Sequence, residues 1–302
     1  MKNVLLASSA LILTAGAAAA DITFSGDARF GIVHDSSVSA DNTGIHNRFT
    51  LNIDAATETD SGLEFFARVR VRGENTGVDG DPVTPGNQAN ASGVSAPRVG
   101  VRAGGVEVAV GNIKGAIEEM PGLYGGEVGL TALGDLNAVA KTTRTSDNWD
   151  MFSSAGGGAN GAEVLYSGNG ISGHLSHSPV SDRTALFAAY EQDTWFVAGG
   201  YQTGDLSIDD KVILTAGATF GNFGVGAGYA DNDGTEKWRL SGTARVGAAT
   251  VLTAFVADDE SATETLWGVG FNHDLGGAEF VGGVVSDEDG ENQADLGLRF
   301  NF

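Results

Sequence analysis

The residues best placed to do chemistry in this chain are arginines that occur at alternating positions in its first third. Of seventeen lysines and arginines, seven arginines share this pattern: Arg29, Arg48, Arg68, Arg70, Arg72, Arg98 and Arg102. Each falls on the polar side of an apolar–polar alternation, as in LEFFARVRVR at 63–72. A row of permanent positive charge on one face of a sheet can select among ions and polar solutes that pass it.

The complementary acidic residues lie in a connection that runs from 113 to about 160. Its carboxylates are Glu118, Glu119, Glu127 and Asp135, and apolar residues separate them. Connections this long are usually functional or disordered. We expect the apolar residues to pack on a wall while the carboxylates face water. The alternative is a surface lid whose charge is incidental.

Other chemistry receives weaker support from the sequence. His174 and His177 are an odd number of positions apart, which places them on opposite faces of a strand, and the chain has no cysteine to complete a transition-metal site. No serine sits in a nucleophile elbow. Acidic stretches at 231–236, 258–264 and 286–292 could gather calcium through oxygen ligands, although solvated outer loops are the favoured interpretation. We therefore expect no resident cofactor, with calcium left open and metal ligands unknown.

The elements that must position these side chains are strands, because apolar residues recur with period two between short turns. The predicted class is all-β, a transmembrane antiparallel barrel of about sixteen strands, in which short turns alternate with long, acidic connections. The predicted strands lie near 21–34, 46–57, 63–72, 94–103, 106–112, 161–167, 171–178, 184–191, 195–203, 211–220, 223–230, 237–246, 249–257, 264–273, 278–286 and 293–302. Their faces are least distinct between 161 and 191.

Strand phase also predicts the direction of the arginines. An arginine that faces lipid costs about 2–4 kcal/mol at the middle of the bilayer. The polar faces, and the arginines on them, should therefore point into a water-filled lumen. Alternatively, Arg48, Arg72 and Arg98 lie near the rims, where charge costs little.

The two ends of the chain make separate predictions. Residues 1–20 read as a secretory signal peptide cleaved after Ala20, with a retained membrane anchor as the alternative. A single barrel domain then occupies 21–302, with 113–160 as its constriction loop region. The last strand runs to Phe302. Because lipid cannot hydrogen-bond a free edge, this strand should pair with the one that begins near Asp21.

Several stretches resemble the general porins of Gram-negative outer membranes, especially those of photosynthetic and related alphaproteobacteria. They are SGDARFG (25–31), TDSGLEF (59–65), GGVEVAVGN (104–112), GLYGGEVGLTAL (122–133) and DLGLRFNF (295–302). The resemblance implies a homotrimer of sixteen-stranded barrels in the outer membrane, in contact with lipid and lipopolysaccharide. It also implies a third loop folded into the lumen and a role for the terminal phenylalanine in recognition by the assembly machinery.

The function predicted from these observations is passive diffusion of ions and small hydrophilic solutes past a charged constriction, with no enzymatic activity and no nucleic-acid partner. A substrate-specific outer-membrane channel is the main alternative. An outer-membrane barrel enzyme is a weaker one, because no catalytic arrangement is recognisable. A secreted calcium-loaded β-solenoid would need a repeat of fixed period, and we find none.

Overall fold

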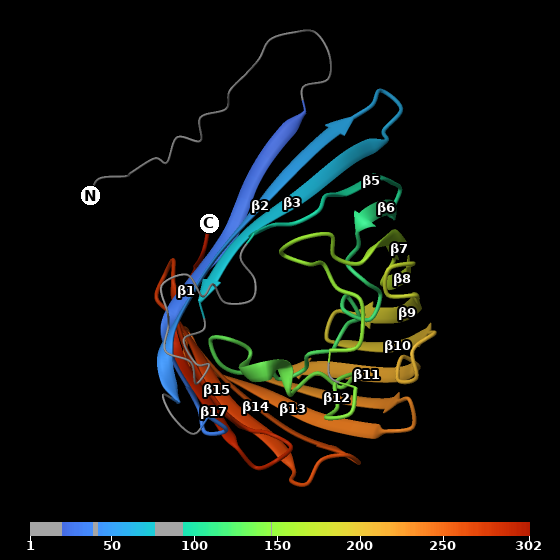
Figure 1. Ribbon diagram of the computed structural model, residues 1–302. Coiled ribbons are helices and arrows are strands. Elements are labelled where there is room, and N and C mark those ends of the chain that lie inside the picture. The colour runs from blue at the N-terminus through green and yellow to red at the C-terminus, as the bar shows by residue number, and fades with distance from the viewer. Residues whose placement is uncertain (1–19, 39–41, 76–92, 146) are drawn as a thin grey trace, which may run out of the picture.

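The computed structural model describes residues 20–38, 42–75, 93–145 and 147–302. The predicted signal peptide at 1–20 lies outside the described residues except for Ala20. One antiparallel sheet contains every strand and closes on itself, with the connection between β6 and β7 inside the ring (Figure 1). No helix in the described part of the chain has the length and apolarity needed to cross a membrane.

The sheet has seventeen strand segments in sequence order. They are β1 Asp21–Asp35, β2 Thr43–Glu58, β3 Glu64–Asn75, β4 Gly93–Val94, β5 Arg98–Ala103, β6 Val106–Asn112, β7 Asn160–Gly168, β8 Ile171–Ser178, β9 Arg183–Gln192, β10 Trp195–Gly204, β11 Lys211–Phe220, β12 Phe223–Asn232, β13 Glu236–Val246, β14 Thr250–Asp259, β15 Leu266–Asp274, β16 Glu279–Ser286 and β17 Asn292–Asn301.

Alternation along each strand separates a lipid-facing surface from the lumen. In β14, Leu252 is exposed on the outside of the barrel. The inward residues Phe255 and Ala257 are buried beneath the connection between β6 and β7, called the inner loop below. Exposed leucines, valines and aromatic residues cover the outside all round the ring. This arrangement confirms the predicted fold, because only a closed sheet leaves no unpaired edge in lipid.

The barrel closes where the last strand meets the first, as predicted. β17 pairs antiparallel with β1 from Asp27 opposite Asn301 onward. Beyond that pair, Gly26 and Phe302 exchange two backbone hydrogen bonds of 2.9 and 3.0 Å. Asp21 lies outside this ladder and pairs with β2 instead. Closure therefore begins at Gly26, where a side chain would collide with the ring of Phe302.

The prediction of a single strand at 94–103 is wrong, because the structure has two separate strands in this region. β4 and β5 both pair with β3, and the N–H of Ser95 still donates to the carbonyl of Arg70 on β3, but residues 96 and 97 leave the ladder. Pro97 has no N–H to donate, and the N–H of Ala96 donates instead to the carbonyl of Gly156 in the inner loop, at 2.6 Å. Within the described ranges, the barrel thus has sixteen strands around its circumference, one of them interrupted at a contact with the loop.

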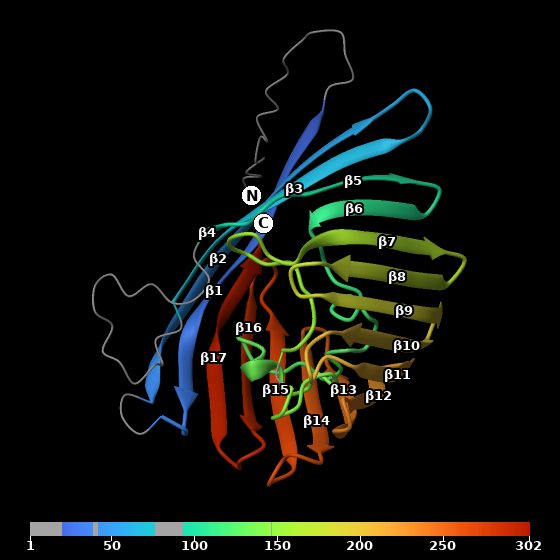
Figure 2. The same cartoon turned by 45° about the vertical axis from the view of Figure 1, so that its right-hand side comes forward.

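The tightly packed apolar core lies between the inner loop and the wall, not inside the sheet. One cluster joins Ile117, Met120 and Leu123 of the loop to wall residues such as Phe187 and Ile213. A second cluster joins the loop segment 128–136 to the inner faces of β14, β15 and β16. The predicted long third loop inside the lumen is confirmed, and both views show it crossing the ring (Figures 1 and 2).

Deleting Phe302 should reduce the amount of barrel in the outer membrane. The deletion removes the last pair of hydrogen bonds at the closing seam and the ring that stacks on Phe49 at 5.5 Å between centroids. The measurement is the quantity of heat-modifiable protein in the outer-membrane fraction, with Phe302→Tyr as the control that keeps a ring. Equal amounts of the deletion variant and the parent would contradict the prediction.

Candidate functional site

Acidic residues of the wall hold backbone N–H groups of the inner loop. Asp295 on β17 accepts hydrogen bonds from the N–H groups of Leu130 and Thr131, both at 2.7 Å, and from the hydroxyl of Thr131 at 2.8 Å. Across the lumen, the buried Glu163 on β7 accepts the N–H of Lys114 at 3.0 Å. These bonds fix the start and the middle of the loop, because a buried backbone donor is costly to leave unpaired.

Two buried lysines of the wall bind backbone carbonyls of the same loop. The ammonium of Lys211 on β11 donates to the carbonyl of Ala140 at 2.9 Å. Lys237 on β13 donates to the carbonyls of Leu136 at 3.1 Å and Lys141 at 2.6 Å. Both lysines are about 1% exposed. Their charge therefore serves the loop backbone and contributes little as a contact surface for solutes.

Arg239 on β13 is the most heavily used of these anchors. Its Nη1 donates to the carbonyls of Leu123 and Asn137, both at 2.6 Å, and its Nη2 donates to that of Gly122 at 2.8 Å. Hydrogen bonds from charged groups are worth about 1.5–3 kcal/mol each. One side chain thus joins two segments of the loop that are separated along the sequence.

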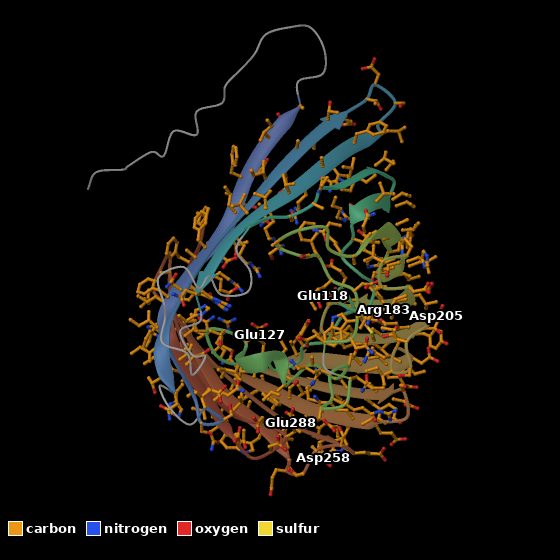
Figure 3. The ribbon with its side chains drawn as sticks, in the orientation of Figure 1. Glu118, Glu127, Arg183, Asp205, Asp258 and Glu288 are labelled. Atoms are coloured by element: carbon orange, nitrogen blue, oxygen red, sulfur yellow. The ribbon has the colours of Figure 1, made fainter. Side chains whose placement is uncertain are left out.

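Glu118 is the acidic loop residue whose position is most constrained. It is half-buried, and one carboxylate oxygen accepts hydrogen bonds from the Tyr124 hydroxyl at 2.6 Å and the Trp149 indole N–H at 2.8 Å. Glu118 and Glu127 both lie on the loop within the ring of strands (Figure 3). The carboxylate of Glu118 therefore stiffens the loop in addition to carrying charge.

The other three predicted acids differ in their surroundings. Glu119 is exposed and pairs with Lys114 at 2.9 Å, whereas Glu127 is exposed and has no partner among the described residues. Asp135 ends the short 3-10 helix η1, Leu133–Asp135. Burial raises the pKa of Asp135 from 3.8 to about 6; Lys141 opposes this shift, while neighbouring acids including Glu127 add to it.

Two of the predicted arginines connect the wall to the loop. Arg29 on β1 donates to the carbonyl of Leu130 at 2.8 Å and to Nε2 of His46 at 2.9 Å. Arg70 on β3 donates to the hydroxyl of Ser154 at 3.3 Å, and its guanidinium lies 4.8 Å from the ring centroid of Phe152. The arginine-rich wall and the loop therefore meet on both sides of the lumen opening.

Three further arginines lie on the inner face of β2 and β3 and pair with wall residues. Arg68 makes a bidentate pair with Asp54 at 2.6 and 3.0 Å, and Arg48 reaches Asp27 at 3.4 Å. Arg72 donates to a threonine hydroxyl on β2 at 3.3 Å. All three remain partly accessible. They carry the charge of this wall toward the water of the lumen.

The remaining two predicted arginines have other surroundings. Arg98 is only 4% exposed and bridges Glu163 and Glu107, each at 2.5 Å. It supports the carboxylate that holds the start of the loop. Arg102 is half-exposed near the short turn that follows β5, where it pairs with Glu64 and Glu107.

Sequence reasoning missed the anchors in the second half of the chain. Lys237 and Arg239 alternate with Trp238 and Leu240, so strand phase alone would have pointed both charges inward. Their partners are backbone carbonyls, which carry no sequence signal. His174 and His177 lie on opposite faces of β8 as predicted. No group of three or more His, Cys, Asp or Glu in the described ranges is arranged to hold a metal ion.

A closed barrel with an apolar exterior, a polar lumen and a loop held across that lumen defines a channel of the bacterial outer-membrane type. The model of the Gram-negative porin family matches residues 7–293, so the chain belongs to that family. It is an outer-membrane protein that provides a route for passive diffusion.

Individual relatives agree with this assignment. The chain is 31% identical to a porin of Fuscovulum blasticum over 301 residues, covering 93% of this chain and all of the relative. It is 28% identical to a porin of Rhodobacter capsulatus, with the same coverage. A solved structure of a triple mutant of the Rhodopseudomonas blastica porin superposes with a TM-score of 0.79 at 28% identity, covering 93% of this chain and 100% of that one.

Replacing the main loop anchor, Arg239→Met, should give a wider and noisier pore. Three carbonyls lose their donor, and the two buried ones, of Leu123 and Asn137, each do so at a cost of about 1–3 kcal/mol. The measurements are single-channel conductance and the rate of protease cleavage within 113–160. Arg245→Met is the control, because Arg245 lies on the same face of β13, is exposed, and has no side-chain bond to any described residue. Equal conductance and equal cleavage rates in the two variants would show that Arg239 does not anchor the loop.

The charge of Asp135 should respond to mild acid. With its pKa at about 6, Asp135 is ionised at pH 7 and neutral at pH 5, where carboxylates with ordinary values near 4 remain charged. Cation preference should therefore fall between pH 7 and pH 5, and Asp135→Asn should abolish much of that change. Reversal potentials at both pH values measure it. An unchanged pH response in Asp135→Asn would show that this residue does not contribute.

Proposed function

We propose that solutes diffusing through this porin pass a charged constriction, in which the acidic inner loop faces an arginine-lined wall. The observation that carries this proposal is the bond between Arg29 and the carbonyl of Leu130, 2.8 Å long. It joins the wall of β1–β3 to the loop, so the open path runs beside this contact. The charged borders of this path are the exposed carboxylates of Glu119 and Glu127 and the accessible arginines Arg48, Arg68, Arg70 and Arg72. Arg98 and Arg102 are in supporting positions.

Opposed rows of charge would create a transverse field across the path. Water dipoles align in such a field, so an apolar solute must displace ordered water, whereas ions and polar solutes find partners on either side. At about 0.15 M salt the Debye length is about 8 Å, so nearby charges outweigh distant loops. The net charge of −22 still enriches cations at the mouths. A modest cation preference at low salt is the expected result.

The wider assignment contains further proposals. The barrel is a homotrimer, which mild detergent should preserve as a heat-labile complex of about three chains, and it contacts lipid and lipopolysaccharide. The chain is exported after cleavage near Ala20, and Phe302 takes part in assembly as well as in closure. The chain acts as a channel and not as an enzyme. Calcium at the acidic outer loops stays a prediction.

Neutralising the two exposed loop acids, in Glu119→Gln with Glu127→Gln, should shift the pore toward anions. Neutralising Arg68 and Arg70 with glutamine should shift it toward cations. A unit charge at about 8 Å in water contributes about 0.5 kcal/mol, so each single substitution should alter the permeability ratio about twofold. Reversal potentials under a salt gradient in planar bilayers measure this ratio.

The matched control is Asp289→Asn, which removes one negative charge from an exposed position in the connection between β16 and β17. It should leave the reversal potential almost unchanged at 0.15 M salt, because its exposed charge lies on an outer connection and not on the inner loop. If the control shifts the potential as much as the loop variants do, selectivity comes from net charge. The constriction proposal would then be wrong.

A further inference from the structure

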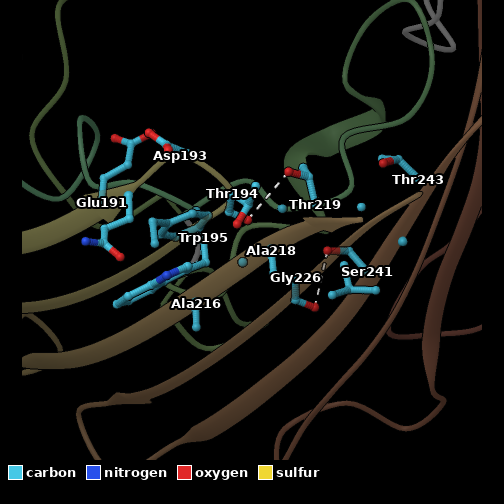
Figure 4. Close-up of a pocket in the computed structure, with 18 of the residues that line it drawn as sticks. Glu191, Asp193, Thr194, Trp195, Ala216, Ala218, Thr219, Gly226, Ser241 and Thr243 are labelled. Carbon is cyan, nitrogen blue, oxygen red and sulfur yellow. Dashed lines mark hydrogen bonds between the residues drawn. The ribbon is translucent and has the colours of Figure 1, made fainter. Parts of the chain in front are cut away.

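A second feature of the lumen is a cleft in the wall formed by β10–β13. Its volume is about 320 Å³. It lies beside Gly122 and Gly125 of the inner loop and extends toward the short turns that join these strands (Figure 4). None of the charged residues assigned to the constriction lines it.

The floor of the cleft consists of glycines on the inner faces of β11 and β12. A methyl group at Gly217 would lie 2.4 Å from the ring of Phe196. At Gly226 it would lie 2.7 Å from the hydroxyl oxygen of Ser241. Glycine at these positions leaves room for the Phe196 ring over Gly217 and for the Ser241 hydroxyl over Gly226, so both groups lie at the floor of the cleft.

Among the hydroxyl side chains that border the cleft, Thr219, Ser241 and Thr243 have spare hydrogen-bonding capacity. Thr219 donates to the carbonyl of Thr194, and Ser241 to that of Gly226, each at 3.5 Å, the upper limit for a hydrogen bond (Figure 4). The Thr243 hydroxyl has no hydrogen-bond partner in the described part of the chain. Each of these groups can both donate and accept, so all three are free to bind a solute.

Charge is present at both borders of the cleft but differs in sign. Arg239, only 1% exposed, lines one border with its guanidinium turned to the inner loop. Glu191 and Asp193 lie on the side opposite Thr243 (Figure 4). An anion is attracted by Arg239 but repelled by these carboxylates, and a cation experiences the reverse. A neutral solute avoids both penalties.

We propose that this cleft is a weak binding subsite for a neutral, hydroxylated ring of monosaccharide size. The ring's hydroxyls would exchange hydrogen bonds with Thr219, Ser241 and Thr243. Its C–H face would lie against Phe196. The volume is at the small end for ligand sites, so it admits one ring and not a chain of several. This inference rests on the proposed diffusion pathway, because the site would be filled only by solutes in transit.

The test uses the full mature protein in planar bilayers, with glucose as the probe and mannitol as an open-chain polyol of similar size. Mannitol should lower ion conductance gradually, as viscosity rises. Glucose should add a saturable decrease, with half-saturation on the order of 10 mM, as expected for a weak site. If glucose and mannitol lower the conductance by the same linear amount, the proposal is overturned.

Two substitutions locate the site. Phe196→Leu removes the ring and keeps most of its bulk, and it should raise the half-saturating glucose concentration about two- to tenfold. Thr243→Val preserves shape, removes one hydroxyl and gives a second reading if the first variant folds poorly. Ser172→Ala is the control, an inward hydroxyl on β8 outside the cleft. A glucose effect that persists unchanged in both cleft variants would overturn the assignment.

The outcome is separable from that of the constriction experiment. Cleft substitutions should leave the reversal potential unchanged, because they alter no charge. The acidic and arginine substitutions should leave the glucose effect in place. If the parent protein shows no saturable glucose effect while the charge substitutions shift selectivity as expected, the subsite alone is refuted. If glucose saturates normally but no charge substitution shifts selectivity, the charged constriction alone is refuted.

Discussion

The structure depends on satisfying an irregular backbone that lies inside a closed barrel. The inner loop has little regular secondary structure, so its buried N–H and C=O groups need partners from elsewhere. The wall provides them by charge: Asp295 and Glu163 accept from N–H groups, whereas Lys211, Lys237 and Arg239 donate to carbonyls. The loop stays across the lumen because the wall matches the polarity of its backbone, group by group.

The charged side chains that point inward consequently fall into two groups with different roles. Buried groups such as Glu163 and Arg239 form hydrogen bonds with the loop backbone and hold the loop rigid. Groups such as Glu119 and Arg68 are partly accessible and pair with only one neighbouring side chain each in the described part of the chain. Strand phase places both populations on the same face of the sheet, and the path of the loop decides which is which. A porin can thus carry many charges inside its barrel while only some of them are accessible from the lumen.

The sequence was informative where a feature depends on local periodicity. The phase of Arg68, Arg70 and Arg72 and most strand bounds follow from alternation, and the closure of the last strand on the first follows from the cost of a free edge in lipid. The break at Pro97 was missed because the apolar pattern continues across it. The carbonyl-binding roles of Lys211 and Arg239 could not be predicted, because they depend on a loop path with no period. The predicted third loop in the lumen came from resemblance to known porins, not from the residues alone.

The most direct test of the anchored loop is a disulfide between loop and wall in Val139→Cys with Gly228→Cys. A Cβ at Gly228 of β12 would lie 3.3 Å from the Cβ of Val139, close to the separation in disulfides, and the chain has no cysteine of its own. Mass spectrometry of the oxidised protein should find the pair cross-linked, with single-channel conductance close to that of the parent. Two free, labelled thiols under oxidising conditions, or a cross-linked form with much altered conductance, would contradict a loop held in this position.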